Sequence, residues 1–251
     1  AGYRTELINE RGDLRGDAGV QPLLRSGLVD GAIVATATLD EQTRALLEGE
    51  RTPIVLVNRE LDGVDRDVVV SDSRTGGARV AELLAELGHR RIAHVAGPAN
   101  TSTAREREAG FAERLEQLGA PLDERRRRAG DFSHRDGYRW TLELIELDPP
   151  PTAIFCANDV IALGALDAAR ARGLDVPGQL SIVGFDDISL AGWESFRLTT
   201  VRQPLPAMAE EAVRLLVERI GNADGPVRRI VFPTELIQRG TTGPVRPASS
   251  G

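Results

Sequence analysis

Hydrogen-bonding side chains lie at or just beyond the ends of four strongly apolar runs in this 251-residue sequence. They are Asn58, Thr103, Arg107, Asn158 and Asp186. A carboxylate accepts hydrogen bonds from two hydroxyls, an amide both donates and accepts, and a guanidinium donates a fork of bonds to neighbouring oxygens. Together these groups predict a site for a polyhydroxylated ligand.

Two of these positions also fit a purely structural role at a helix N-terminus. Thr103 and Glu106 have the spacing of a capping box, in which each side chain bonds a backbone amide of the other residue. Asn158 or Asp159 fits an N-cap. Capping and ligand binding are therefore both open at these positions.

Structural explanations are also open for the charged and the aromatic candidates. Arg107 lies one turn into its predicted helix, where it could pair with Glu108, with Glu113 or with solvent. Asp186 is harder to explain structurally, because Asp187 already supplies a carboxylate to the same turn. Phe132 and Trp193 fit either core packing or an apolar platform against a sugar ring or a base.

The elements that must position these side chains follow an α/β pattern. Apolar runs rich in Val and Ile predict strands, and the runs are nearly continuous, which is typical of strands buried on both faces. The runs are Gly31–Ala35, Pro53–Val57, Asp67–Val70, Arg91–Ala96, Thr152–Ala157 and Leu180–Phe185. Helical spacing of apolar residues predicts helices over Ser73–Leu87, Ala104–Leu118, Asp159–Arg172 and Ala209–Ile220. In parallel sheets of this class the ligand site lies outside the carboxyl ends of the strands.

Signatures of catalysis and of metal binding are absent from the sequence. The motifs GxSxG, GxxxxGK[ST] and GxGxxG do not occur, and His89, His94 and His134 lack the spacing of metal ligands. We expect His89 to cap helix carbonyls, and Cys156, the single cysteine, to be an inert buried thiol. The sequence predicts no enzyme, no metal and no cofactor.

The amino-acid composition limits the kinds of partner that this chain can bind. The formal net charge of −7 is unfavourable for DNA binding by this chain alone. The four-arginine run Arg125–Arg128 fits a solvated loop, with a phosphate or nucleic-acid contact as the alternative. No run approaches the roughly 18 apolar residues of a membrane span, so we expect no membrane contact.

Nine segments, in this order, resemble the effector-binding core of the LacI/GalR (lactose-repressor) family of bacterial transcription regulators. They are Val29–Val34, Pro53–Arg59, Glu86–Pro98, Thr103–Phe111, Gly130–Tyr138, Pro150–Leu166, Val176–Ile188, Leu198–Pro204 and Pro233–Pro244. They cover nearly the whole chain, and nine motifs in order are specific where one alone is not.

The resemblance implies a type I periplasmic-binding-protein-like fold, with two doubly wound parallel-sheet subdomains joined by three crossovers and a ligand cleft between them. The N-terminal subdomain would comprise residues 1–70 and 204–228, and the C-terminal subdomain residues 71–203 and 229–243, followed by a tail, 244–251. The family's effector-binding positions correspond to Arg107, Asn158 and Asp186. Further candidates are Phe132, Thr103, Gln203, Asn58 and Trp193.

Some family features are missing or altered. The resemblance implies an N-terminal helix-turn-helix, a first core strand and most of its helix, none of which is found in these residues. Ala1–Asn9 resembles the second strand, with polar Thr5 and Glu6 where apolar residues are usual. Phe196–Arg197 replaces a proline pair before the crossover.

The resemblance therefore predicts the effector-sensing domain of a cytoplasmic regulator that binds a sugar or related small metabolite. It implies a homodimer that reaches operator DNA only through an N-terminal domain outside this chain. A solute-binding protein of a transporter is the alternative, and an enzyme on this fold is a third. The coding sequence upstream would discriminate between them, because a helix-turn-helix supports the first and a signal peptide the second.

Overall fold

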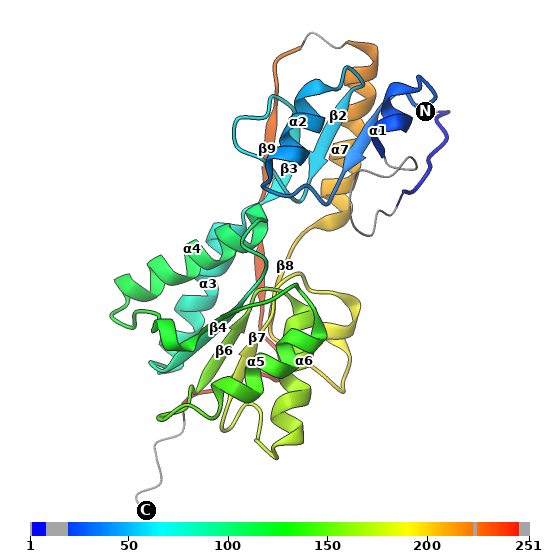
Figure 1. Ribbon diagram of the computed structural model, residues 1–251. Helices are drawn as coiled ribbons and strands as arrows, with labels where there is room; N and C mark the ends of the chain where they lie inside the picture. Colours follow the sequence, from blue (N-terminus) through cyan, green and yellow to red (C-terminus); the bar gives the residue numbers. More distant parts are fainter. Residues whose placement is uncertain (1, 9–19, 223–224, 246–251) are drawn as a thin grey trace, which may run out of the picture. The chain divides into compact units, whose positions relative to one another are not determined.

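The computed structural model describes residues 2–8, 20–222 and 225–245, and they form two compact units (Figure 1). Unit 1 comprises Ala1–Val70 and Pro206–Ile230, and unit 2 comprises Ser71–Leu205 and Val231–Gly251. The chain therefore passes from one unit to the other three times.

Unit 1 is built on a sheet in the order β1-β2-β3-β9, in which β1, β2 and β3 run parallel. The strands are β1 (Ala32–Val34), β2 (Ile54–Val57), β3 (Asp67–Ser71) and β9 (Arg229–Phe232). The helices are α1 (Val20–Arg25), α2 (Glu41–Gly49) and α7 (Leu205–Gly221). Alternate residues of the two central strands supply one core, together with Leu24 and Leu47 from the helices.

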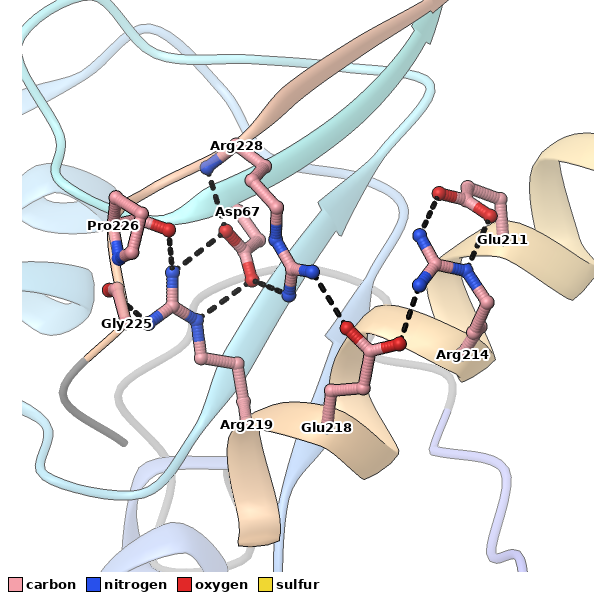
Figure 2. Close-up of polar contacts among 8 residues, drawn as sticks. All are labelled: Asp67, Glu211, Arg214, Glu218, Arg219, Gly225, Pro226 and Arg228. Atoms are coloured by element: carbon pink, nitrogen blue, oxygen red, sulfur yellow. Dashed lines mark hydrogen bonds and ion pairs between the residues drawn. The ribbon is translucent and has the colours of Figure 1, made fainter. Parts of the chain in front are cut away.

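A buried carboxylate joins three parts of unit 1 (Figure 2). Asp67 begins β3, and its side chain has no exposed surface. It accepts hydrogen bonds from Nε of Arg219 on α7 at 2.7 Å and from the backbone amide of Arg228 at 2.8 Å. Arg219 also donates to the carbonyl oxygens of Gly225 and Pro226. The cluster ties the start of β3 to the end of α7 and to the segment that enters β9.

Unit 2 is built on a parallel sheet in the order β5-β4-β6-β7, with an antiparallel pair, β10-β8. The strands are β4 (Ile92–Ala96), β5 (Arg127–Ala129), β6 (Ala153–Cys156), β7 (Ser181–Val183), β8 (Thr200–Arg202) and β10 (Glu235–Ile237). The α-helices are α3 (Ser73–Glu86), α4 (Ser102–Gln117), α5 (His134–Leu144) and α6 (Asp159–Ala171). Two 3-10 turns complete it, η1 (Glu124–Arg126) and η2 (Ser189–Gly192).

The sheet of unit 2 is covered on both faces. Helices α3 and α4 lie on one side and α5 and α6 on the other (Figure 1). On β6, Ala153 and Phe155 pack with α3 and α4, whereas Ile154 and Cys156 pack with α5 and α6. Because both faces of each strand are buried, each strand appears in the sequence as a continuous apolar run.

Glycines allow the helix pair α3–α4 to cross closely. A Cβ atom on Gly77 would lie 2.2 Å from the carbonyl oxygen of Arg107, and one on Gly110 would lie 1.9 Å from that of Arg74. No real side chain fits at such distances. The crossing therefore fixes the position of Arg107 along α4.

All six predicted strands are present, so the α/β prediction is confirmed, but two other expectations are wrong. Residues 2–8 form no strand, because polar Thr5 and Glu6 give the segment no continuous apolar face. The run Arg125–Arg128 is not a solvated loop. It forms η1 and the start of β5, and its side chains pair with Asp123, Glu108 and Glu143.

Candidate functional site

The strand order of unit 2 creates a switch point between β4 and β6. The chain leaves β4 for α4 on one face of the sheet and leaves β6 for α6 on the other. Ligands of open parallel sheets bind at such a point, outside the carboxyl ends of the strands. The side chains that follow β4, β6 and β7 therefore make up the candidate site in unit 2.

Arg107 and Asp186 form an ion pair at this edge of the sheet. Nη2 of Arg107 lies 2.9 Å from Oδ1 of Asp186, and Nη1 donates to the carbonyl oxygen of Ala157 at 2.6 Å. The guanidinium carbon lies 3.9 Å from the centre of the Phe185 ring. Only 2% of Arg107 is exposed, against 25% of the Asp186 side chain. The arginine is thus a buried support, and the carboxylate reaches the surface.

Burial lowers the pKa of the Arg107 guanidinium, and the charge of Asp186 opposes that shift. A guanidinium stays protonated in proteins, so Arg107 presents a positive charge to Asp186. The two glutamates that the sequence offered as partners are engaged elsewhere. Glu108 pairs with Arg127 and Glu113 pairs with Arg74, so the expectation of a purely local partner for Arg107 is wrong.

Gln203 extends the ion pair into a chain of polar contacts. Its Nε2 donates to Oδ1 of Asp186 at 2.7 Å, and its Oε1 accepts from Oγ of Ser71 at 2.6 Å. Gln203 is 6% exposed and follows β8, and Ser71 ends β3. Two segments at which the chain passes between the units therefore contact the effector candidates of unit 2 directly.

Asn158 is the N-cap of α6, as the capping alternative predicted. Its Oδ1 accepts from the backbone amide of Ile161 at 2.8 Å, so the Nδ2 group is the part that can donate to a ligand. Asn158 is adjacent in the chain to Ala157, whose carbonyl holds Arg107. Capping and ligand binding are thus compatible in one side chain.

Asp159, next along the chain, is buried and linked to the crossover strand. It accepts hydrogen bonds from Oγ1 of Thr200 at 2.5 Å and from the backbone amide of Ile188 at 2.9 Å. Burial raises its pKa to about 7, and the charges of Asp186 and Asp187 add to the shift, while the two hydrogen bonds oppose it. Asp159 thus joins α6 to β8 and to the loop that carries Asp186.

The raised pKa of Asp159 predicts a pH dependence of stability. Because the folded pKa of about 7 lies above the ordinary value of 3.8, the contribution is fully present below 3.8 and is lost as the pH rises through about 7. We expect the stability of the wild type relative to Asp159→Asn to fall by about 2 kcal/mol between roughly pH 5 and pH 8.

Urea unfolding followed by tryptophan fluorescence at the two pH values measures this difference. Complete burial lowers the pKa of His94 to about 4, so it titrates in the same window with the opposite sign. His94 is present in both proteins, and its contribution cancels in the comparison. A difference that does not change with pH would contradict the prediction.

Thr103 is not the helix cap that its sequence suggested. Helix α4 begins at Ser102, and Thr101 caps it by accepting from the amide of Ala104. Thr103 is buried one turn before Arg107 on the same helix. The capping explanation therefore moves to Thr101, and Thr103 keeps its predicted role as a ligand contact.

Three predicted site residues have left-handed backbone conformations, which are unusual for residues other than glycine. Asn58, Phe132 and Asp186 have φ angles of 67°, 58° and 113°, and Asp187 follows with 55°. Such strain persists only where the surrounding structure imposes it, and it clusters at functional sites. The Phe132 ring lies against Gly97 beyond β4, where a Cβ atom would meet its Cε1 at 2.3 Å.

Two predicted residues do not join this cluster. Trp193 follows η2 and is 58% exposed. Asn58 belongs to unit 1, where it follows β2, and its buried Oδ1 has no hydrogen-bond partner among the described residues. That unsatisfied acceptor is a reason to retain Asn58 as a candidate.

The structure also adds residues that the sequence did not single out. Ser71 holds Gln203, Phe185 lies beneath Arg107, and Thr200 bonds Asp159. Ser71 could have been found from the sequence, since it is the polar residue that ends an otherwise apolar run. The other contacts join residues far apart in the chain, and no local pattern marks them.

The histidine and cysteine predictions have mixed outcomes. Cys156 is a buried free thiol, and burial raises its pKa, which confirms an inert residue. The His89 side chain does not cap α3. Its ring contacts Oγ1 of Thr152 and the carbonyl oxygen of Gly243, while the backbone amides of residues 87–89 donate to the last carbonyls of α3. In the described part of the chain no cluster of three or more metal-ligating side chains occurs, and no helix is long and apolar enough to cross a membrane.

Comparisons with known proteins agree with this architecture. A family model described as "Periplasmic binding protein-like domain" matches residues 81–242. The HTH-type transcriptional regulator DegA of Bacillus subtilis (strain 168) is 36% identical over 226 residues, which cover 89% of this chain and 67% of DegA.

Solved structures show the same fold. The complex of the transcriptional regulator CelR with cellobiose has a TM-score of 0.83 and 33% identity, covering 88% of this chain and 68% of CelR. A LacI family transcriptional regulator from Enterococcus faecium with bound ribose has a TM-score of 0.79 and 26% identity, covering 90% of this chain and 84% of that chain. The chain belongs to the LacI family of transcription regulators and carries the periplasmic-binding-protein-like domain of that family.

Proposed function

We propose that this domain binds a sugar or a related polyhydroxylated metabolite and thereby controls a DNA-binding domain of the same regulator. The observation that carries the proposal is the Arg107–Asp186–Gln203 cluster at the switch point of unit 2. A carboxylate held by two donors and still reaching the surface suits adjacent ligand hydroxyls, since a carboxylate offers about four lone-pair directions. CelR and the Enterococcus regulator carry cellobiose and ribose in their structures, which supports the same ligand class.

Asn158, Thr103 and Phe132 would complete the contacts in unit 2. The Nδ2 group of Asn158 would donate to a ligand oxygen, and the Phe132 ring would lie against an apolar face of the sugar. Asn58 and Trp193 remain proposed contacts.

A thermal-shift screen of sugars, nucleosides and their phosphates tests the proposal, followed by calorimetric titration of each compound that raises the melting temperature. We expect a saturable, one-to-one interaction with at least one polyhydroxylated compound. If none binds while the protein is folded, the ligand class is wrong.

The alternative of a transporter's solute-binding protein is less well supported, because the relative described above is a helix-turn-helix regulator. The coding sequence upstream of residue 1 separates the two. A helix-turn-helix agrees with our proposal, and an export signal contradicts it.

We further propose that the regulator is a homodimer. Helix-turn-helix proteins read two-fold symmetric operators, and a two-fold site requires a two-fold protein. The net charge of −7 leaves DNA contact to a domain outside this chain. Sedimentation equilibrium of the regulator containing this domain measures the assembly, and a monomer at micromolar concentration would contradict the proposal.

A further inference from the structure

A second concave site lies within unit 2 and shares no residue with the Arg107–Asp186–Gln203 cluster. It has a volume of about 300 Å³ and lies beside the second half of α6 and the segment that follows η2. Its apolar walls are Leu166, Leu174, Val176 and Phe196. All four pack with the core of unit 2, so the walls are firmly supported. The volume is at the lower end of the range for small-molecule sites.

Two guanidinium groups lie at the rim of this pocket. Arg170 and Arg197 both line it, and their side chains are 62% and 61% exposed. Nη1 of Arg170 pairs with Asp167 at 2.8 Å. The nearest carboxylate to Arg197 is that of Glu194, which lies 3.9 Å from Nε and is 94% exposed. A contact so long and so solvated binds weakly, so Arg197 can exchange it for a ligand at little cost.

The backbone of Arg197 is held in an unusual conformation. Its φ angle is 42°, and among the described residues it is the one non-glycine position with left-handed φ that lies outside the effector candidates and the adjacent Asp187. Its amide donates to the carbonyl oxygen of Trp193 at 2.8 Å, and its own carbonyl accepts from Gly240 at 2.7 Å. The fold thus imposes this conformation at a residue that lines the pocket.

We propose that this pocket binds a small amphipathic organic anion, with an apolar body against Phe196 and Leu174 and a carboxylate at Arg197. Apolar walls alone would favour a neutral ligand as much as a charged one. The rim carries two guanidinium groups and one carboxylate, that of the exposed Glu194, so its charge is positive on balance. A guanidinium donates two parallel hydrogen bonds to a carboxylate. Charge complementarity therefore selects the anion.

Calorimetric titration with a matched pair of probes tests this. The probes are 4-phenylbutyrate and 4-phenylbutanol, which share the apolar body and differ in the carboxylate. At low ionic strength we expect the acid to bind about tenfold more tightly than the alcohol, in line with one charge-assisted contact. Trp193 directly precedes the pocket segment, so its fluorescence should change in parallel.

Three variants test where the acid probe binds. Arg197→Asn removes the cation and keeps a residue that tolerates left-handed φ. It should lower the affinity for the acid about tenfold and change the affinity for the alcohol by no more than about twofold. Arg172→Asn removes an arginine that caps α6 and pairs with Glu146 outside the pocket. It should change the affinity for neither probe. Asp186→Asn should also leave the affinity for the acid unchanged.

Three results would overturn the proposal. One is equal affinity for acid and alcohol, and another is the absence of saturable binding of either probe. The third is a loss of acid binding in Arg172→Asn equal to that in Arg197→Asn, or a changed acid affinity in Asp186→Asn, because the probe would then bind by general charge or at the effector candidates. None of these results bears on sugar binding at Asp186, so the two proposals fail separately.

Discussion

Replacing Asp67 with alanine is expected to lower the free energy of unfolding of unit 1 by about 3–5 kcal/mol. The carboxylate is fully buried and receives hydrogen bonds from Arg219 and from both the backbone and the side chain of Arg228 (Figure 2). Removing it takes this carboxylate away from Arg219, whose side chain is only 11% exposed, whereas Arg228 keeps its ion pair with Glu218. The loss of an interaction partner for a buried charge costs more than the net contribution of the intact pair.

Two probes assign the effect to unit 1. Both tryptophans, Trp140 and Trp193, belong to unit 2, so their fluorescence follows that unit, whereas circular dichroism follows the helices of both. In Asp67→Ala we expect part of the circular-dichroism signal to be lost at lower denaturant, with the fluorescence transition nearly unchanged. A shift of both transitions by the same amount would contradict a local role in unit 1.

The control is an ion pair from the same helix. Arg214 pairs with Glu211 and Glu218 on α7, and its side chain is 51% exposed (Figure 2). Such solvated pairs contribute about 0–1 kcal/mol. Arg214→Ala removes one arginine near the Asp67 cluster. Because its ion pairs are solvated, both transitions should nevertheless stay close to those of the wild type.

Asp67 also predicts acid sensitivity of unit 1. Burial alone would raise the pKa of Asp67, but hydrogen bonds from Arg219 and Arg228 lower it below the ordinary value of 3.8. A lowered folded-state pKa contributes stability that is present above 3.8 and is lost as the pH falls through the folded value. The difference between wild type and Asp67→Ala should therefore shrink in acid below about pH 4.

Much of the fold could be predicted because strands buried on both faces leave a continuous apolar run in the sequence. Ile92–Ala96 and Ala153–Cys156 were found in this way, as were the polar residues that follow them. The parallel arrangement then predicts that those residues lie at one edge of a sheet. That inference led to Asp186 and Asn158 without any contact being visible in the sequence.

The pairing of those residues could not be predicted. Glu108 and Glu113 are nearer to Arg107 in the sequence, but its side chain pairs with Asp186, and the α3–α4 crossing at Gly77 and Gly110 fixes where Arg107 lies along α4. The choice of Thr101 over Thr103 as the cap depends on where α4 begins, and both residues are threonine. Left-handed φ angles at Asn58 and Phe132 are imposed by tertiary contacts, because neither position is a glycine.

Asp186→Asn is expected to weaken effector binding about tenfold to a hundredfold. It also removes the countercharge of the buried Arg107, so we expect some loss of stability in unit 2, smaller than in Arg107→Ala because the asparagine Oδ1 can still accept from Arg107. The substitution preserves the size of the side chain, and asparagine tolerates the φ angle of 113°. It removes the charge that would accept hydrogen bonds from ligand hydroxyls. Charge-assisted hydrogen bonds contribute about 1.5–3 kcal/mol each, which sets the expected range.

Calorimetric titration with the compound found by thermal-shift screening measures the affinity. Glu106→Gln is the matched control, since Glu106 precedes Arg107 on α4, is 45% exposed and pairs with Arg74. It makes the same carboxylate-to-amide change on the helix surface, and its affinity should equal that of the wild type. Equal affinity in Asp186→Asn would show that the effector does not contact this carboxylate.

Arg107→Ala cannot replace this test, because Arg107 is a support as much as a candidate ligand contact. The side chain is 2% exposed and stacked on Phe185, so its removal leaves a cavity and an unpaired Asp186. We expect that variant to lower the unfolding midpoint seen by tryptophan fluorescence as well as the affinity. If Asp186→Asn lost at least as much affinity as Arg107→Ala with a smaller loss of stability, the carboxylate would be the recognition group and the arginine the residue that positions it.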